Sequence, residues 1–480
     1  MEQFVKRAAV WLVLIVMASM ALGGCKESKY ARVKDTEFEK TGYLIGTKRP
    51  EIVYGDRIKT SEYYYVVKNN SKKTVAIVGV AKAYGTSGQQ VYEGTDDIAV
   101  LGPGETSVLM FTMHGLDRAE IDHVDCELQY YKTELTPVLG DIQQEVMRSE
   151  DKLTVLVTNK SAVDVQFLKG TVLFFDSENN VIGSKTQQFK EKEYSYLDVM
   201  KPETSRAVMF FPENWTKVLA TEEFPGYDHA EVYLTYLDDP PENAIKKSTP
   251  FMDYTEDVLQ VKEIHCKNTE GYQIHCLAVK NISDQTIGVH GVMEVCDTSN
   301  NPLAARTATV DALAPGQETI LAFEFDVFDP LDLWEDYYGD YVATDDIRDA
   351  DHVIYTLKYD PDPDVEAKSY STKVLDYDIY DRVFKEVLVT YTGNEEILRP
   401  KVYGVFYDSE GNIVFAGYAS DDTFNGGRSL DEFVVKDTIE NGDTVIYGFS
   451  WFSRWLCIKE TGKHRDMQEY EKADIYIVDR

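Results

Sequence analysis

Positive charge is scarce in this sequence, in which 49 Lys and Arg residues stand against 83 Asp and Glu, for a formal net charge of −34. A chain this acidic has no sequence-wide positive field with which to hold a phosphate backbone, so DNA and RNA are not expected as partners. The acidity is not that of a disordered tail, because 43% of the residues are hydrophobic and 12% are aromatic. That is enough strand-forming material to build cores, and the length predicts several domains at roughly 100 to 200 residues each.

Recognisable catalytic motifs are also lacking. The chain has no G-x-S-x-G elbow, no H-E-x-x-H, no P-loop and no strand-G-x-G-x-x-G-helix unit, and its 8 His are scattered. We therefore expect a protein that is not an enzyme and that uses no cofactor. An envelope hydrolase with an unrecognised carboxylate site remains an alternative, because the spatial separation of two carboxylates cannot be read from a sequence.

Long apolar runs are absent except for 15 residues from Ala8 to Leu22, which follow Lys6 and Arg7. A spanning helix needs about 20 residues, so residues 1–24 are predicted to be an export signal. Leu22, Gly23, Gly24 and Cys25 resemble the bacterial lipobox. The resemblance implies cleavage before Cys25, a lipid on its sulfur, and anchoring at the extracytoplasmic face of the cell membrane. An ordinary secretory signal or an uncleaved anchor are the alternatives, and residues 25–50, of mixed charge, are predicted to form a tether.

The remainder of the chain repeats one pattern four times. Each block opens with an apolar strand that ends in a polar turn, and the anchor residues at this turn are Asn69, Asn159, Asn281 and Tyr391. A second strand follows in each block and ends 15, 16, 15 and 16 residues later, at Tyr84, Phe175, Cys296 and Tyr407. A Pro or Gly turn, an alternating strand and a closing strand complete each block. Short alternating strands separated by turns at this spacing predict antiparallel β-sandwiches.

Pro- and Asp-rich breaks near Pro137, Pro240 and Pro361 divide the blocks. We therefore predict an all-β protein with four tandem immunoglobulin-like sandwiches, at residues 51–136, 137–240, 241–362 and 363–480. Dividing the chain after residue 24 into four gives blocks near the about 100 residues of an immunoglobulin-type domain.

The repeats resemble the bacterial immunoglobulin-like FxLYD family of exported lipoproteins. The resemblance rests on the N-x-S turn, on the corner that ends in Asp176, Asp297 or Asp408, and on the later Pro-Gly-Glu-Thr turn. It covers roughly residues 50–480 and implies a β-sandwich fold, which hosts no single function.

Two His-Cys pairs, His265-Cys266 and His275-Cys276, lie on the two strands of a predicted hairpin. Neighbouring residues on a strand point to opposite faces, so each pair cannot converge on one zinc ion, and no metal site is expected. A cross-strand disulfide between Cys266 and Cys276 is possible after export, provided that the strand register brings them together. Cys126, Cys296 and Cys457 are interpreted as core thiols.

Polar clusters at the turns have local explanations. Asp360, Asp362 and Asp364 do not begin an EF-hand loop, because Val365 stands where its Gly is required. The cluster from Asp408 to Asn412 and the three N-x-S triplets are interpreted as hairpin and Asx turns.

Aromatic side chains in the variable inserts are the candidate binding residues. They are Trp215, Trp334, Tyr337, Tyr338, Tyr341, Trp451 and Trp455. Such residues can anchor a protein or a glycan, although Trp215 and Trp334 can equally cap the ends of their own sandwiches. The predicted function is a lipid-anchored binding array with a protein or glycan partner. An accessory scaffold subunit of an envelope transport or secretion complex is the nearer alternative.

Overall fold

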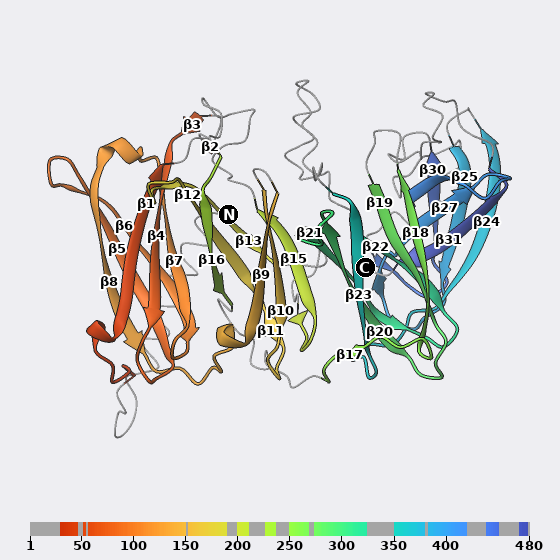
Figure 1. Ribbon diagram of the computed structural model, residues 1–480, viewed down its shortest axis with the longest axis horizontal. Coiled ribbons are helices and arrows are strands. Elements are labelled where there is room, and N and C mark those ends of the chain that lie inside the picture. Colours follow the sequence, from red (N-terminus) through yellow and green to blue (C-terminus); the bar gives the residue numbers. More distant parts are fainter. Residues whose placement is uncertain are drawn as a thin grey trace.

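The computed structural model describes residues 29–46, 51–53, 56–149, 152–189, 199–210, 226–236, 249–267, 273–323, 350–379, 383–419, 438–450 and 470–478. These residues form an all-β protein of four immunoglobulin-like sandwiches, which lie in a row along its longest axis (Figure 1). The predicted fold class is therefore confirmed.

Repeat 1 contains two three-stranded antiparallel sheets. Its first sheet has the order β1-β4-β7, with strands Phe38–Gly46, Thr60–Asn69 and Thr106–His114. Its second sheet has the order β6-β5-β8, with strands Gln90–Leu101, Val75–Gly85 and Ile121–Tyr131. The hairpin β2-β3 (Glu51–Val53 and Asp56–Ile58) and the 3-10 turns Asp35–Glu37 and Arg118–Glu120 complete it.

Repeat 2 follows the same plan after a 3-10 turn at Leu139–Asp141. Its first sheet has the order β15-β10-β9, with strands Ser205–Phe210, Lys152–Asn159 and Ile142–Ser149. Its second sheet has the order β13-β12-β16, with strands Val181–Gln188, Lys169–Phe175 and His229–Thr235. The short strands β11 (Val165–Gln166) and β14 (Val199–Met200) pair at its end.

Repeats 3 and 4 have the same strand order, except that the second sheet of repeat 3 has the additional edge strand β17. In repeat 3 the first sheet is β18-β19-β22 (Leu259–Lys267, Gln273–Asn281, Glu318–Ala322), and the second is β17-β23-β20-β21 (Met252–Asp253, His352–Asp360, Ile287–Cys296, Pro302–Leu313). In repeat 4 the first sheet is β24-β25-β30 (Tyr370–Ile379, Val383–Tyr391, Thr444–Ser450), and the second is β28-β27-β31 (Ile413–Tyr418, Lys401–Tyr407, Lys472–Val478). The short strands β26 (Ile397–Leu398) and β29 (Thr438–Ile439) pair beside them.

Strand β1 corrects the predicted tether. It pairs with β4 over nine residues, from Phe38 opposite Asn69 to Gly46 opposite Ser61. Phe38 is buried and its ring stacks on that of Tyr130 with centroids 4.2 Å apart. The assignment of residues 25–50 to a tether is therefore wrong for Phe38–Gly46, which form the opening strand of repeat 1.

The repeated Asn at the end of β4, β10 and β19 forms a buried hydrogen-bonding turn, which we call the Asn corner. In repeat 1, Nδ2 of Asn69 donates to the carbonyl oxygens of Lys73 (2.8 Å) and Leu101 (2.9 Å), while its Oδ1 accepts the backbone N–H of Ser71. Asn159 and Asn281 make the equivalent bonds in repeats 2 and 3. The interpretation of the N-x-S triplets as Asx turns is confirmed.

The repeated Asp at the end of the next strand forms a tight turn. Oδ1 of Asp408 accepts the backbone N–H groups of Glu410 and Asn412, both at 2.9 Å, and Gly411 has a φ of 81°. Asp176 and Asp297 make the same pair of bonds. These carboxylates therefore satisfy backbone donors of their own turns, as predicted.

Successive repeats pack sheet on sheet. The outer face of each first sheet contacts the outer face of the second sheet of the next repeat. Tyr64 and Val66 of repeat 1 share an apolar cluster with Leu173 and Phe175 of repeat 2. Leu156 and Met147 of repeat 2 meet Val292 and Ala305 of repeat 3. Cys276 and Ala278 of repeat 3 meet Tyr403 and Val405 of repeat 4. Both faces of each inner sheet are therefore covered.

The four repeats share one orientation in the row. Oγ of Ser107 donates to the carbonyl oxygen of Leu234 (2.8 Å), and Oγ1 of Thr319 donates to that of Ile477 (2.7 Å). Lys201 pairs with Asp360 at 3.0 Å across the middle junction. All these groups lie at the Asn-corner ends of their strands, so the Asn corners share one side of the row and the opposite strand ends share the other.

Candidate functional site

The closing connection of each repeat joins the last strand of its first sheet to the last strand of its second sheet. These connections comprise residues 115–120, 211–228, 323–351 and 451–471. Each starts at the strand end opposite the Asn corner, because β4 and β7, for example, pair from Thr60 opposite His114. Since the repeats share one orientation, the strand ends from which the four closing connections start lie on the same side of the row.

The point where each long closing connection enters its last strand is fixed by a repeated backbone bond. The N–H groups of Asp228, Asp351 and Glu471 donate to the carbonyl oxygens of Phe175, Cys296 and Tyr407, at 2.8, 2.9 and 2.8 Å. These acceptors are equivalent residues of the three repeats. In each hairpin the register of pairing with the following strand shifts at this residue. The fold therefore supports three long connections at equivalent places.

The predicted lipidation residue and the predicted aromatic binding residues lie outside the described residues. They are Cys25, Trp215, Trp334, Tyr337, Tyr338, Tyr341, Trp451 and Trp455. All of these residues except Cys25 belong to the closing connections of repeats 2, 3 and 4.

His265 and His275 face each other across the hairpin of repeat 3. They are directly opposed in the register, and their rings stack with centroids 4.5 Å apart. Burial, and then the neighbouring His265, lower the pKa of His275 to about 4. The hydroxyl oxygen of Tyr355 lies 3.4 Å from Nδ1 of His275. A neutral His275 ring that stacks on His265 and contacts Tyr355 fits a position in the core of repeat 3.

The cysteines beside these histidines point the other way, and the disulfide considered from the sequence is not formed. Cys266 lies opposite Ile274, and Cys276 lies opposite Ile264, so the two thiols are diagonal neighbours. Diagonal positions are about 7–8 Å apart, whereas a disulfide needs Cβ atoms about 3.5–4.5 Å apart. Sγ of Cys276 instead lies 3.1 Å from the hydroxyl of Tyr403 in repeat 4. Cys126 is half-buried and Cys296 is buried, whereas Cys457 lies outside the described residues.

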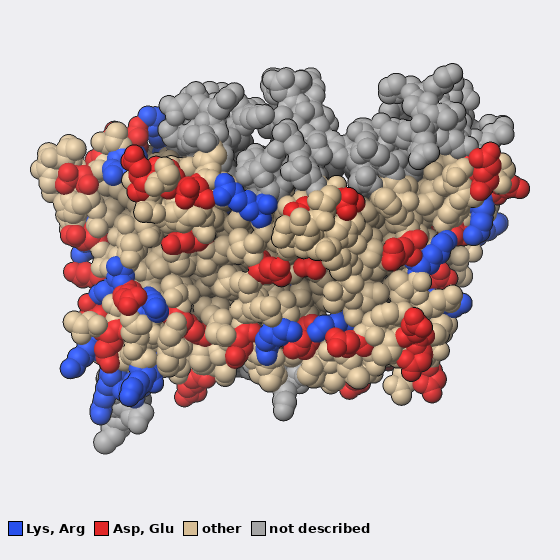
Figure 2. Space-filling view, viewed as in Figure 1, with Lys and Arg blue, Asp and Glu red and all other residues tan. Residues whose placement is uncertain are grey.

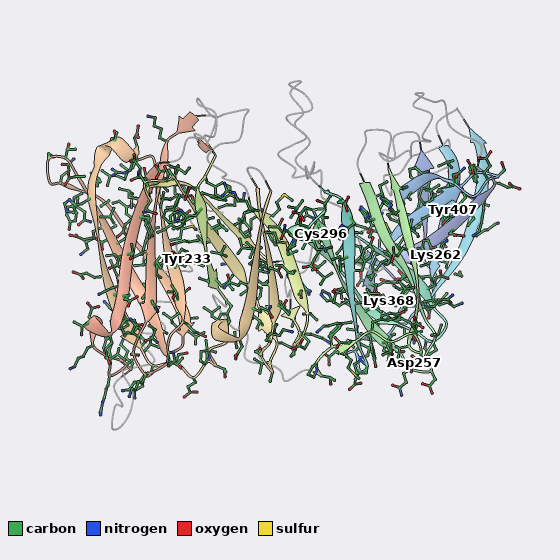
Figure 3. The ribbon with its side chains drawn as sticks, in the orientation of Figure 1. Tyr233, Asp257, Lys262, Cys296, Lys368 and Tyr407 are labelled. Carbon is green, nitrogen blue, oxygen red and sulfur yellow. The ribbon has the colours of Figure 1, made fainter. Side chains whose placement is uncertain are left out.

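The junction between repeats 3 and 4 also carries a charged contact that the sequence analysis missed. Nζ of Lys262 donates to the hydroxyl of Tyr407 at 3.1 Å and lies 3.5 Å from Oδ2 of Asp474. Lys262 and Tyr407 are labelled side by side in Figure 3. The hydrogen bond to Tyr407 raises the pKa of Lys262. The lysine therefore ties the outer face of one sheet to the next repeat.

Charge on the visible face of the row is dispersed. Asp and Glu side chains are spread along its length between basic ones, without one continuous acidic patch (Figure 2). Within the described ranges, no group of three or more His, Cys, Asp or Glu side chains is arranged to hold a metal ion. Among the same residues, no helix is long and apolar enough to cross a bilayer.

Comparisons with known proteins add little. No family model matches this chain, and no curated protein matches it. One solved structure that matches is the native conformation of alpha-2-macroglobulin from E. coli, at 9% sequence identity and a TM-score of 0.12. The match covers 95% of this chain but only 30% of that chain. A likeness this weak carries no argument about fold or function.

Proposed function

We propose that this chain is a lipid-anchored, non-catalytic extracytoplasmic protein that presents a row of binding connections to a protein or glycan partner. The observation that carries the proposal is the shared orientation of the repeats. It puts the strand ends that flank the closing connections on one side of the row, and backbone bonds at Asp228, Asp351 and Glu471 hold the last residues of three of these connections. Loops held at regular intervals by a rigid scaffold are suited to bind one extended partner at several points.

The candidate anchors are the aromatic residues of these connections. Tryptophan and tyrosine supply large contact areas at little cost in conformational entropy, and they dominate many binding interfaces. Three long connections carry Trp215, Trp334 or the pair Trp451 and Trp455. In repeat 1 the connection is short, residues 115–120, and contains neither Trp nor Tyr. Binding is therefore assigned to repeats 2, 3 and 4.

The membrane attachment is tested separately from binding. Cells that express the full chain are fed an alkynyl fatty acid, and the purified protein is examined for label. We expect labelling of the wild type and its loss in Cys25→Ala. Equal labelling of both proteins contradicts lipidation at Cys25 and leaves the binding proposal to its own test.

Binding is tested by crosslinking the full chain in intact membranes and by probing an array of envelope glycans. We expect Trp334→Ala to lose a captured partner or glycan while its urea unfolding midpoint stays unchanged. Tyr30→Ala is the matched control, because Tyr30 is 46% exposed and pairs with Tyr131 of repeat 1, outside the closing connections. A lowered unfolding midpoint with retained binding assigns Trp334 to the sandwich core and contradicts the proposal.

A further inference from the structure

The two ends of the row leave one sheet face each without a neighbouring repeat. At every junction the first sheet of one repeat packs on the second sheet of the next. The second sheet of repeat 1, β6-β5-β8, and the first sheet of repeat 4, β24-β25-β30, therefore lie at opposite ends. We call their outer faces the head face and the tail face.

The junction between repeats 3 and 4 provides the pattern against which these faces are compared. Lys262 contacts Tyr407 and Asp474 at its margin. The residues that pack inside it are apolar: Ile264, Cys276, Ala278 and Ile320 from repeat 3, and Tyr403, Val405, Ala416 and Tyr476 from repeat 4. One lysine at the edge of an apolar patch thus meets a tyrosine and an aspartate on the opposing sheet.

The tail face repeats the lysine side of this junction. Lys373 lies opposite Leu388, three residues before the corner at Tyr391, as Lys262 lies opposite Ala278, three residues before Asn281. By the same register, Leu375, Leu388 and Ile446 take the places of Ile264, Ala278 and Ile320. Lys373 is exposed, and a Cβ atom added to Gly448 on this face would meet no atom within 4 Å. Among the described residues nothing covers this face at Gly448, and the face carries the same edge lysine.

The head face repeats the acceptor side. Tyr84 is equivalent to Tyr407, because the register of β5 with β6 shifts at Tyr84 as the register of β27 with β28 shifts at Tyr407. Asp125 lies opposite Lys82, two residues before Tyr84, as Asp474 lies opposite Val405, two residues before Tyr407. Asp125 is exposed and Tyr84 is partly exposed. The head face therefore carries a tyrosine and an aspartate at the positions of Tyr407 and Asp474, which contact Lys262 within the chain.

The two faces also differ from the junction in complementary ways. Lys82 replaces Val405 at the head, and Glu386 replaces Cys276 at the tail, so a positive charge at one end is matched by an acid at the other. Glu93 and Glu127 replace Ala416 and Tyr476 and make the head face more polar. Acidic side chains also approach one another at the middle junction, where burial, and then the charge of Glu145 in repeat 2, raise the pKa of Glu294 in repeat 3.

We propose that copies of this chain associate head to tail, with the tail face of one copy on the head face of the next. Lys373 of one copy then pairs with Asp125 and Tyr84 of its neighbour. The contact is heterologous, so it leaves a head face and a tail face available and extends the row. The charged residues of the head face make it weaker than the junctions within the chain, which are also favoured by covalent linkage.

The experiment is sedimentation velocity of the full chain, purified in a density-matched detergent, over protein concentrations of about 1 to 300 µM. We expect the average mass of the wild type to rise with concentration. Lys373→Glu and Asp125→Lys should each weaken association about tenfold or more, because each places like charges in contact. The double variant, with the two charges exchanged, should regain association to within about threefold of the wild type.

Lys72→Glu is the control, because it changes the net charge as Lys373→Glu does but lies at an exposed turn of repeat 1. Unchanged urea midpoints establish that each variant is folded. A wild type whose mass is constant over the whole range overturns the proposal. Association that is indifferent to Lys373→Glu and Asp125→Lys, or equally weakened by Lys72→Glu, also overturns it, because contact then occurs elsewhere or depends only on total charge.

Discussion

The backbone N–H of Ser205 in repeat 2 donates a 3.0 Å hydrogen bond to Nε2 of His290 in repeat 3. The other ring nitrogen, Nδ1, lies 2.7 Å from Oγ1 of Thr309, and the side chain is 1% exposed. Burial, together with the charges of Arg206 and Lys358, lowers the pKa of His290 well below its ordinary value. A ring that accepts a backbone N–H is neutral, so this junction depends on an unprotonated histidine.

Acidification should therefore weaken the fold through His290. The unfolded chain takes up a proton near pH 6.5 that the folded ring does not, so stability is present above that pH and falls below it. Between pH 7 and pH 5 this single group accounts for a loss of about 2 kcal/mol in the free energy of unfolding. His290→Gln, which keeps an acceptor for Ser205, should lose that much less over the same interval in urea unfolding.

His123→Gln is the matched control, because it makes the same exchange at an exposed histidine of repeat 1, away from this junction. His275 contributes with the same sign in all three proteins and cancels in the comparison. Equal losses in the wild type and in His290→Gln would show that the ring is not held neutral at this junction.

Two adjacent asparagines differ sharply in their expected contribution to stability. Asn69 is fully buried and its side chain donates to two carbonyl oxygens, whereas Asn70 is exposed and its side chain donates to Glu39 at the surface. Asn69→Ala removes a buried donor from the carbonyl oxygens of Lys73 and Leu101 and should cost about 1–3 kcal/mol. Asn70→Ala should change the free energy of unfolding by less than about 0.5 kcal/mol. Comparable costs for the two variants would contradict the assigned role of the corner.

The sequence predicted the repeats and missed their packing for one physical reason. The turns are local: an Asn two residues before a Ser, or an Asp before a tight turn, specifies its own hydrogen bonds, and the regular spacing exposes the strand order. The packing of one repeat on the next is not local. Its signal is the unbroken apolar run in central strands, such as Tyr63–Val67 of β4 and Val172–Phe175 of β12, which indicates burial on both faces.

Strand β1 escaped prediction because its apolar signal is weak. Lys40, Thr41 and Gly42 interrupt the run between Phe38 and Leu44, so the segment has the composition of a linker. Its place is set by β4, with which it pairs along its whole length. The predicted aromatic binding residues have no comparable pattern, since inserts that differ between repeats carry no register from which their positions follow.

A glycine at an equivalent place in repeats 1, 2 and 3 lets the two sheets approach. These are Gly79, Gly170 and Gly291, which lie five residues before Tyr84, Phe175 and Cys296, respectively. A Cβ atom at Gly291 would lie 2.8 Å from Cζ of Phe323 and 3.1 Å from Cδ1 of Leu321. Gly291→Ala should therefore destabilise the protein by about 1–3 kcal/mol through overpacking.

Gly448→Ala is the matched control on a strand of repeat 4, where the added methyl group meets no atom within 4 Å. It should stabilise the protein by about 0.5–1 kcal/mol, because alanine has less backbone entropy to lose on folding. Both variants are measured by urea unfolding. Destabilisation of equal size at the two sites would mean that glycine is needed for backbone conformation and not for space.

The diagonal placement of Cys266 and Cys276 predicts that both remain thiols under oxidising conditions. Non-reducing peptide mapping should find no bond between them, and dithiothreitol should leave the urea midpoint unchanged. Cys276 is fully buried at the junction with repeat 4, whereas Cys266 is partly exposed, so iodoacetamide should label Cys266 first. Ile274→Cys supplies the positive control, because position 274 is directly opposite Cys266 and their Cα atoms are about 4.5–5.5 Å apart, within disulfide range. A native Cys266–Cys276 bond would require the pairing of β18 with β19 to shift by two residues, which would separate His275 from its partner His265.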